Sequence, residues 1–320
     1  MSAMPRPRQR SQKGGSVEPV SNLERSGLLR KALKDNGFCR IIEVHSPAAA
    51  IIAERSRGSN REFDGFWSSS LTDSALRGLP DTELLDPRSR IEWATATVAL
   101  TKKPLIIDGD TGGRCEHFAF SVRHMEREGL SAVIIEDKAG EKRNSLLSGD
   151  DLHTMAGVDA FAEKIAVGKA AQASDGFMVI ARLEGLITGL PREEILARAA
   201  AYVAAGADGL VVHSRSSDEN LVIGLARELR VRHPDTPLVA IPTAYPGTGE
   251  DELIRAGINL VIYANQMFRA SLLAMESVAQ SILDNGRALE AEPHCLATHD
   301  LLHLTEGLHE SRGPEFARVL

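Results

Sequence analysis

The order of predicted elements indicates an α/β protein built as a (β/α)8 barrel. Eight short apolar segments are typical of strands, and a helix, or a loop and a helix, follows each of them. Strands separated by helices pair in parallel through right-handed crossovers. Eight such units within roughly 250 residues favour one closed barrel over two domains. An open, doubly wound sheet is the main alternative, but no Gly-x-Gly-x-x-Gly turn follows the first strand, which weakens a dinucleotide-binding prediction.

The predicted strands are short apolar runs bounded by polar or turn-forming residues. Two of these runs end in a carboxylate residue, Asp108 in one and Glu136 in the other. Apolar runs of this length fit the buried strands of a parallel sheet. In chain order, we predict strands at 38–44, 63–67, 104–108, 132–136, 176–182, 209–213, 238–242 and 259–263.

The predicted helices follow from apolar spacing and from cap residues. A helix at 22–35 precedes the first strand, because Leu29 and Leu33 belong to an apolar repeat of helical spacing and a glycine follows at position 37. Asp86 caps the helix that precedes the third strand. After the first strand, helices are predicted at 47–53, 88–101, 116–128, 158–173, 192–205, 221–233, 250–256 and 266–285.

The chain divides into three predicted regions. Residues 1–21 are rich in Arg, Pro, Ser, Gln and Gly without an apolar signal segment, and we expect a disordered tail. A contact between this tail and an acidic partner is the alternative interpretation. Residues 22–288 form the catalytic barrel. Residues 289–320 form a linker and a C-terminal helical segment, whose helix is predicted at 299–308.

Composition excludes several classes of function. The net charge is −7 and aromatic residues make up 4% of the chain, so neither a basic surface nor stacking platforms for nucleic acid are expected. No apolar run reaches the roughly 18 to 20 residues that span a bilayer. Three widely spaced cysteines indicate reduced thiols. We therefore expect a cytoplasmic protein that acts on a small molecule, with no nucleic-acid or membrane partner.

Polar groups follow almost every predicted strand. In a (β/α)8 barrel the active site lies at the C-terminal ends of the strands. One or two such groups are explained by capping, but a full ring of them is harder to explain by stability alone. The strand ends carry His45, Trp67 with Ser69 and Ser70, Asp108 with Asp110, Glu136 with Lys138, Arg182 with Glu184, His213, Thr243 and Asn265.

One side of this ring is acidic. Asp108 and Asp110 alternate along the third strand end and can point the same way, and Glu136 and loop residue Asp81 add further carboxylates. Carboxylates with few imidazoles and no thiolate favour Mg²⁺ or Mn²⁺ over zinc. Taken alone, the Asp-Gly-Asp segment is better explained as a polar turn between strand and loop.

The other side of the ring is cationic and suits an anion. It combines Arg182 and His213 with three residues of a long polar loop at 137–155, Lys142, Asn144 and Ser145. Such a loop is uncommon in a compact domain unless it serves a function, for example as a lid. His213 as a structural histidine remains an alternative. Trp67 is better explained by packing, whereas the serines that follow it can offer backbone N–H groups to a carboxylate.

These residues resemble the phosphoenolpyruvate mutase family of the isocitrate lyase superfamily, from about residue 28 to about residue 308. A Glu-Asp-Lys segment followed by Lys-x-Asn-Ser is a signature of the mutase branch. The matching segments are Trp67-Ser68-Ser69-Ser70-Leu71, Asp108-Gly109-Asp110-Thr111-Gly112, Glu136-Asp137-Lys138, Lys142-Arg143-Asn144-Ser145, Ala181-Arg182-Leu183-Glu184 and His213-Ser214.

The resemblance implies an isomerase that interconverts phosphoenolpyruvate and phosphonopyruvate, the carbon–phosphorus bond-forming step of phosphonate biosynthesis. It implies that Mg²⁺, or Mn²⁺, binds Asp108 directly and Asp81, Asp110 and Glu136 through water. It also implies a C-terminal helix exchanged between subunits in a homotetramer, a dimer of dimers. The implied substrate-binding residues are Trp67, Ser69, Ser70, Leu71, Arg182 and His213, and the implied catalytic residues are Asp81, Lys142, Asn144, Ser145, Arg182 and His213.

Some positions depart from the family pattern. Ser70 stands where the family commonly has glycine, and residues 113–118 differ from the common mutase sequence. The segment at 242–246 is closer to phosphonopyruvate hydrolase, but that enzyme usually replaces Asn144 with threonine, so the mutase is favoured. A carbon–carbon lyase ranks third, because the loop at 137–155 lacks the cysteine that such lyases use. A non-enzymatic scaffold is the last alternative. It ranks low because it would leave the ring of polar residues at the strand ends without an explanation.

Overall fold

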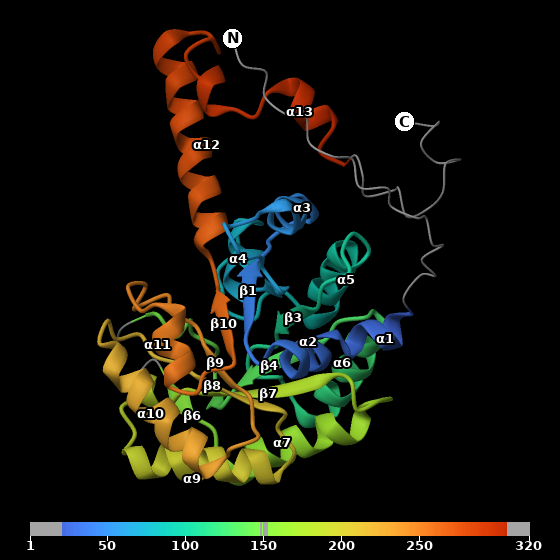
Figure 1. Cartoon of the computed structure of the whole chain (residues 1–320), viewed down its shortest axis with the longest axis vertical. Coiled ribbons are helices and arrows are strands. Elements are labelled where there is room, and N and C mark those ends of the chain that lie inside the picture. The colour runs from blue at the N-terminus through green and yellow to red at the C-terminus, as the bar shows by residue number, and fades with distance from the viewer. Residues whose placement is uncertain (1–20, 148, 150–152, 306–320) are drawn as a thin grey trace, which may run out of the picture.

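Eight parallel strands close into a barrel (Figure 1). The structure, a computed structural model, describes residues 21–147, 149 and 153–305. Neighbouring strands follow the order β1-β10-β9-β8-β7-β4-β3-β2. This closed order confirms the predicted (β/α)8 barrel and excludes the open sheet. The barrel strands are β1 (Cys39–Glu43), β2 (Gly65–Ser68), β3 (Leu105–Asp108), β4 (Ala132–Glu136), β7 (Met178–Leu183), β8 (Gly209–Val212), β9 (Leu238–Ala240) and β10 (Leu260–Tyr263).

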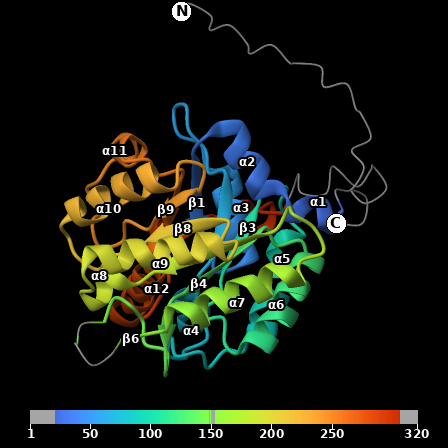
Figure 2. The same ribbon diagram turned by 90° about the horizontal axis from the view of Figure 1, so that it is seen from below.

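Helices connect the strands and surround most of the barrel, as the view from below shows (Figure 2). The crossovers between parallel strands require such connections. The helices predicted after β1 are present as α3 (Pro47–Arg55), α5 (Pro87–Val98), α6 (Cys115–Arg127), α7 (Val158–Ala171), α9 (Arg192–Ala204), α10 (Glu219–Arg232), α11 (Glu250–Arg255) and α12 (Gln266–Asn285).

The strands separate two apolar layers. Ile41, Ile106 and Ile180 belong to the layer inside the barrel, and Leu29 joins them from the helix before β1. The other layer lies between strands and helices and includes Phe161. Leu29 thus helps to close the amino end of the barrel, which leaves the opposite end for the polar groups.

The predicted helix at 22–35 is two helices, so this prediction was wrong in one respect. α1 (Asn22–Ser26) and α2 (Leu28–Asn36) are separated by Gly27. Gly27 lies against Gly176, and a Cβ on Gly176 would lie 3.0 Å from the Gly27 Cα. The chain turns at this close backbone contact, which apolar spacing along the sequence does not reveal.

Three further elements differ from the predictions. The loop after β4 contains a two-stranded antiparallel ribbon of β5 (Lys138–Ala139) and β6 (Thr154–Met155). Two short helices, α4 (Ser70–Ala75) and α8 (Gly185–Thr188), were not predicted. These elements are too short to show the periodicity on which helix prediction depends.

The C-terminal part leaves the barrel. α12 extends away from the strands (Figure 1), and Phe268 is its one buried residue. A 3-10 turn, η2 (Glu292–His294), and a short helix, α13 (Thr298–Leu302), follow. α13 is shorter than predicted, and residues 306–308 of that prediction lie outside the described range, as do residues 1–20 of the predicted tail. Among the described helices, none combines the length and apolar character needed to cross a membrane.

Candidate active site

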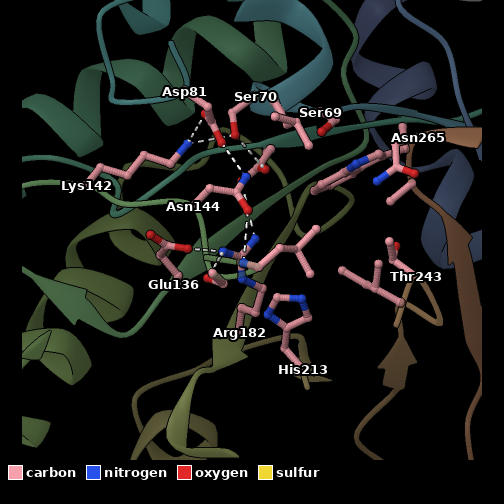
Figure 3. Close-up of a pocket in the computed structure, with 17 residues that line it drawn as sticks. Ser69, Ser70, Asp81, Glu136, Lys142, Asn144, Arg182, His213, Thr243 and Asn265 are labelled. Carbon is pink, nitrogen blue, oxygen red and sulfur yellow. Dashed lines mark hydrogen bonds and ion pairs between the residues drawn. The ribbon is translucent and has the colours of Figure 1, made fainter. Parts of the chain in front are cut away.

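A pocket opens at the C-terminal ends of the barrel strands (Figure 3). Every site residue predicted from the sequence lines it except Asp110. Residues distant in sequence therefore meet here, as the barrel predicts. The pocket is lined by Trp67, Ser69, Ser70, Leu71, Asp81, Asp108, Glu136, Lys142, Asn144, Ser145, Leu146, Arg182, His213, Ile241, Thr243, Ala264 and Asn265.

Asp108 and Asp110 are held by a tight turn after β3. Gly109 is required between them, because a Cβ there would lie 2.6 Å from Val133 Cγ2. Asp110 adopts a φ of 53°, and its N–H donates to Asp108 Oδ1 at 3.2 Å. The Ser70 hydroxyl donates to Asp108 Oδ2 at 3.1 Å. Asp108 thus faces the pocket, whereas Asp110 is buried beside it.

Arg90 of α5 neutralises part of this acidic side. Its guanidinium lies 3.1 Å from Asp73 and 3.1 Å from Asp110, and it donates to the backbone carbonyl of Asp108 at 2.5 Å. Sequence reasoning missed Arg90, because nothing in its helix distinguishes it from a surface arginine. Its burial and its two carboxylate partners appear only in the folded chain.

The pKa values of the two neighbouring carboxyls, Asp108 and Asp110, shift in opposite directions. Burial tends to raise the pKa of Asp108, but Arg182, Lys142 and Arg90 together hold it below its usual range. Burial raises the pKa of Asp110, and the nearby charge of Asp108 raises it further. Asp108 therefore favours its anionic form more strongly than Asp110 does.

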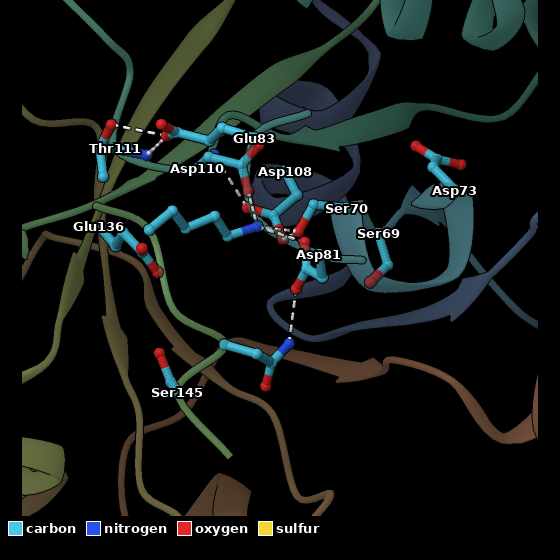
Figure 4. A network of polar contacts seen from close by, with 12 residues as sticks. Ser69, Ser70, Asp73, Asp81, Glu83, Asp108, Asp110, Thr111, Glu136 and Ser145 are labelled. Atoms are coloured by element: carbon cyan, nitrogen blue, oxygen red, sulfur yellow. Dashed lines mark hydrogen bonds and ion pairs between the residues drawn. The ribbon is translucent and has the colours of Figure 1, made fainter. Parts of the chain in front are cut away.

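Figure 4 shows Asp81, Asp108 and Asp110 close to Ser70 on this acidic side. Lys142 enters it from the loop after β4. Its ammonium donates to Ser70 Oγ at 2.8 Å and to Asp81 Oδ1 at 2.5 Å, and it also contacts Asp110 Oδ1. Burial tends to lower the pKa of Lys142, but the carboxylates raise it above its ordinary value. Lys142 is thus a fixed positive charge among acids.

Asn144 and Ser145 follow Lys142 into the pocket. Asn144 Nδ2 donates to Asp81 Oδ2 at 2.6 Å. The Ser145 hydroxyl accepts from Lys138 Nζ at 2.8 Å and lies 3.5 Å from Arg182 Nη2. The loop therefore joins the acidic and cationic sides of the pocket.

Arg182 and His213 share one buried carboxylate. Arg182 Nε donates to Glu184 Oε1 at 2.5 Å, and His213 Nδ1 lies 2.9 Å from the same oxygen. Burial tends to raise the pKa of Glu184, but Arg182 and His213 lower it well below its usual value. Arg182 also contacts Glu136. Glu184 orients both side chains, a contribution that its place two residues after Arg182 suggested only weakly.

The wall away from these charges carries uncharged side chains. Figure 3 shows Thr243 and Asn265 opposite Glu136 and Lys142. The Asn265 Oδ1 atom is buried and has no hydrogen-bond partner within the described residues. His45, another strand-end residue, is absent from the pocket lining, and it instead lies 3.2 Å from Glu43 and packs edge-on against Phe268.

The acidic side has the donor chemistry for a hard divalent cation. Carboxylate oxygens are the ligands such ions prefer, and Glu136 Oε1 is buried without a hydrogen bond, 3.3 Å from the Lys138 ammonium. Across the described ranges, no three Asp, Glu, His or Cys side chains form a ready ligand cluster. The Lys142 ammonium instead lies against Asp81 and Asp110. The residues fit a metal if this ion pairing gives way to it.

Comparisons with known proteins agree with this site. The family model described as phosphoenolpyruvate phosphomutase matches residues 29–283. The phosphoenolpyruvate phosphomutase of Tetrahymena pyriformis is 30% identical over 285 residues, which cover 89% of this chain and 92% of the relative. The crystal structure of the phosphoenolpyruvate phosphomutase from Streptomyces platensis subsp. rosaceus superposes with a TM-score of 0.84 at 35% identity, covering 92% of this chain and 99% of that one.

A hydrolase is similar to nearly the same degree. The crystal structure of phosphonopyruvate hydrolase complexed with oxalate and Mg²⁺ superposes with a TM-score of 0.78 at 30% identity, covering 92% of this chain and 97% of that one. Mutase and hydrolase relatives thus share the fold and most of the chain length. The chain belongs to the phosphoenolpyruvate phosphomutase family of enzymes.

Proposed function

We propose that this enzyme is a Mg²⁺-dependent phosphoenolpyruvate phosphomutase, which interconverts phosphoenolpyruvate and 3-phosphonopyruvate in phosphonate biosynthesis. The observation that carries the proposal is the position of Asn144. Its amide lies 2.6 Å from Asp81, between the carboxylates and the Arg182–His213 pair. An amide can contact a moving phosphoryl group but is too weak a base to activate water.

The metal is proposed to bind Asp108 directly and Asp81, Asp110 and Glu136 through water. When bound, Mg²⁺ supplies the positive charge that stabilises an enolate oxygen and a neighbouring carboxylate. Asp108 lines the pocket and Asp110 does not, which supports Asp108 as the direct ligand. A relative in complex with oxalate and Mg²⁺ supports the choice of ion, and Mn²⁺ is the alternative.

The two ends of the substrate are proposed to bind opposite walls. The backbone N–H groups of Ser69, Ser70 and Leu71, beside Trp67, suit the carboxylate of the pyruvate unit. In the forward reaction the bond from phosphorus to the enolate oxygen breaks and a bond from phosphorus to the methylene carbon forms; the back reaction reverses both changes. Five residues suit the phosphoryl group. These are Lys142, Asn144, Ser145, Arg182 and His213.

Phosphoryl transfer of this kind depends on position and charge. The transition state is loose and metaphosphate-like, so catalysis is mostly placement and electrostatic stabilisation. The enolate must remain in place while the phosphorus moves, and water must be excluded. We propose that the loop carrying Lys142 and Asn144 serves as the lid over the pocket, with Asp81 positioning both side chains.

Phosphonopyruvate hydrolase is the alternative function. Thr243 lines the pocket within a segment, 242–246, that resembles the hydrolase, and a hydrolase structure is 30% identical. A carbon–carbon lyase ranks lower, because residues 137–155 contain no cysteine. These activities differ in whether water enters and in which bond breaks.

One assay separates the three activities. The purified full-length protein is incubated with phosphonopyruvate and Mg²⁺ while phosphorus NMR follows the products. Phosphoenolpyruvate supports the mutase. Inorganic phosphate with pyruvate would establish the hydrolase, and absence of turnover would contradict both. A parallel sample with EDTA tests the metal.

We further propose that α12 packs against a second copy of this chain, as part of a homotetramer. Leu273 and Leu283 are 69% and 78% exposed on α12, which stands away from its own barrel. Exposed apolar surface of this kind marks an interface. Sedimentation should show a tetramer, and Leu273→Glu should shift it to smaller species; a monomeric wild type would contradict the proposal.

We also propose a cytoplasmic location. The three cysteines are all free thiols. Free thiols agree with a reducing compartment, and fractionation of cells with an antibody against the protein tests this location.

A further inference from the structure

The base of the loop after β4 is fixed by a buried network that no catalytic role requires. Asp137 is the first residue after β4 and is fully buried. Its carboxylate accepts from the Glu184 N–H at 2.8 Å and from the Tyr202 hydroxyl at 2.9 Å. A buried carboxylate in a surface loop is costly unless such donors satisfy it.

The backbone of Asp137 joins the two ends of the same loop. Its carbonyl accepts from the N–H of Ala156 at 2.9 Å, next to the β5–β6 ribbon. The carbonyl of Ala156 in turn accepts from Arg198 Nη1 at 2.9 Å. The first residue of the loop and the residue that follows its end are therefore held together.

Arg198 and Tyr202 come from the same face of α9, because they are four residues apart. Arg198 Nη1 lies 3.2 Å from the Tyr202 hydroxyl and 3.6 Å from Asp137 Oδ2. The Tyr202 ring packs edge-on against Phe161 of α7, with ring centroids 4.8 Å apart. α9 thus presents a rigid pair of donors to the loop base.

This network continues into the pocket. The N–H that binds the Asp137 carboxylate belongs to Glu184, whose side chain orients Arg182 and His213. Lys142 and Asn144 lie at the tip of the loop, away from this base, and line the pocket. One buried carboxylate, Asp137, therefore connects the loop to the segment that follows β7.

We propose that Tyr202 and Arg198 are positioning residues, which clamp the loop base through Asp137 and so set where Lys142, Asn144 and Ser145 lie. The clamp is distinct from the pocket, because neither Tyr202 nor Arg198 lines it. The catalytic consequence rests on the proposed function, whereas the mechanical consequence does not.

Limited trypsin digestion tests the mechanical part without substrate. The bonds after Lys142 and Arg143 lie in the loop, and mass spectrometry identifies the two large fragments. Tyr202→Phe removes only the hydroxyl, and loop cleavage should become about tenfold faster, since a hydrogen bond to a charged group is lost. Equal cleavage rates for wild type and Tyr202→Phe would overturn the clamp.

Tyr263→Phe is the matched control. The Tyr263 hydroxyl also donates to a carboxylate, Glu250 Oε1, at 2.9 Å, but on the outside of β10. The Tyr263→Phe variant should leave the rate of loop cleavage unchanged. Faster cleavage in both variants would overturn the proposal, because it would show that loss of any such hydrogen bond loosens the whole protein. Arg198→Lys serves as a second variant if Tyr202→Phe does not fold, with the same expected increase.

Turnover tests the catalytic part. With phosphonopyruvate and Mg²⁺, Tyr202→Phe should lower kcat about tenfold while KM changes less than about threefold, because the clamp positions groups that act in the transition state. An unchanged kcat, or a rise in KM alone, would overturn the positioning role. If the wild type shows no turnover but the cleavage difference remains, the proposed function fails and the clamp stands.

Discussion

The two ends of the loop after β4 are built on different physical principles. At its tip, the contacts are charged and reach across the pocket, as when Lys142 Nζ donates to Asp81 at 2.5 Å. At its base, the contacts are buried, run to neighbouring elements and satisfy both oxygens of one carboxylate, Asp137. A metal or a substrate that enters the pocket can replace the partners of the tip. The buried contacts of the base lie outside the pocket and stay in place.

This difference separates chemistry from positioning. Changes at the tip and its acidic partners should reduce turnover with little effect on folding. Changes at the base should alter stability, pH dependence or loop order first, and turnover only through them. The following four predictions test this division.

The largest effect is expected at Asp108, the acid that faces the tip. Asp108→Ala should lower turnover by on the order of 10⁴-fold or more and abolish metal dependence, as for other essential catalytic groups. Steady-state kinetics across a Mg²⁺ series measure both effects. Asp108→Asn, which keeps the volume but not the charge, is the control for packing. Retained metal-dependent activity in Asp108→Ala would refute the metal assignment.

The next effect is expected at Asn144 of the tip. Asn144→Ala should lower kcat roughly 10²- to 10³-fold, the usual loss when one transition-state donor is removed. The midpoint of thermal unfolding should change little, because Asn144 is not part of the core. Unchanged rates would mean that the amide does not contact the reacting group.

At the base, Asp137 should act through pH-dependent stability. Burial raises the pKa of its carboxyl from 3.8 to about 6. Between these values the folded state binds the proton more tightly than the unfolded chain does, so the stability contribution is greatest at low pH and falls as pH rises.

The expected fall is roughly 3 kcal/mol, from a shift of about two units at 1.36 kcal/mol each. Urea unfolding of wild type and Asp137→Asn at pH 4, 5, 6 and 7 measures it. The free energy of unfolding of the wild type, relative to the variant, should decrease from pH 4 to 6 and then level off. A difference that is constant or increases with pH contradicts the prediction.

The smallest effect is expected at Ser70. Its hydroxyl donates to Asp108 and accepts from Lys142, but water can replace a hydroxyl at this position. Ser70→Gly should therefore change the Mg²⁺ concentration for half-maximal activity by less than about tenfold. A much larger change would show that the side chain, and not only the backbone N–H, takes part in the site.

The sequence by itself determined the barrel and most of the pocket wall. Apolar runs and the helices between them repeat locally, so eight parallel strands followed from spacing alone. Since all strand ends of such a barrel meet at one rim, residues as far apart as Ser70 and His213 were expected together, and both line the pocket.

Only the tertiary structure decided which groups pair beneath that wall. Arg90 lies between Asp73 and Asp110, and Tyr202 reaches Asp137 from 65 residues away. The break at Gly27 likewise depends on a distant glycine. Such contacts are set by how helices pack on the barrel, and local periodicity carries no information about them. The strand pattern therefore predicted where the site lies, while packing determined what holds it in place.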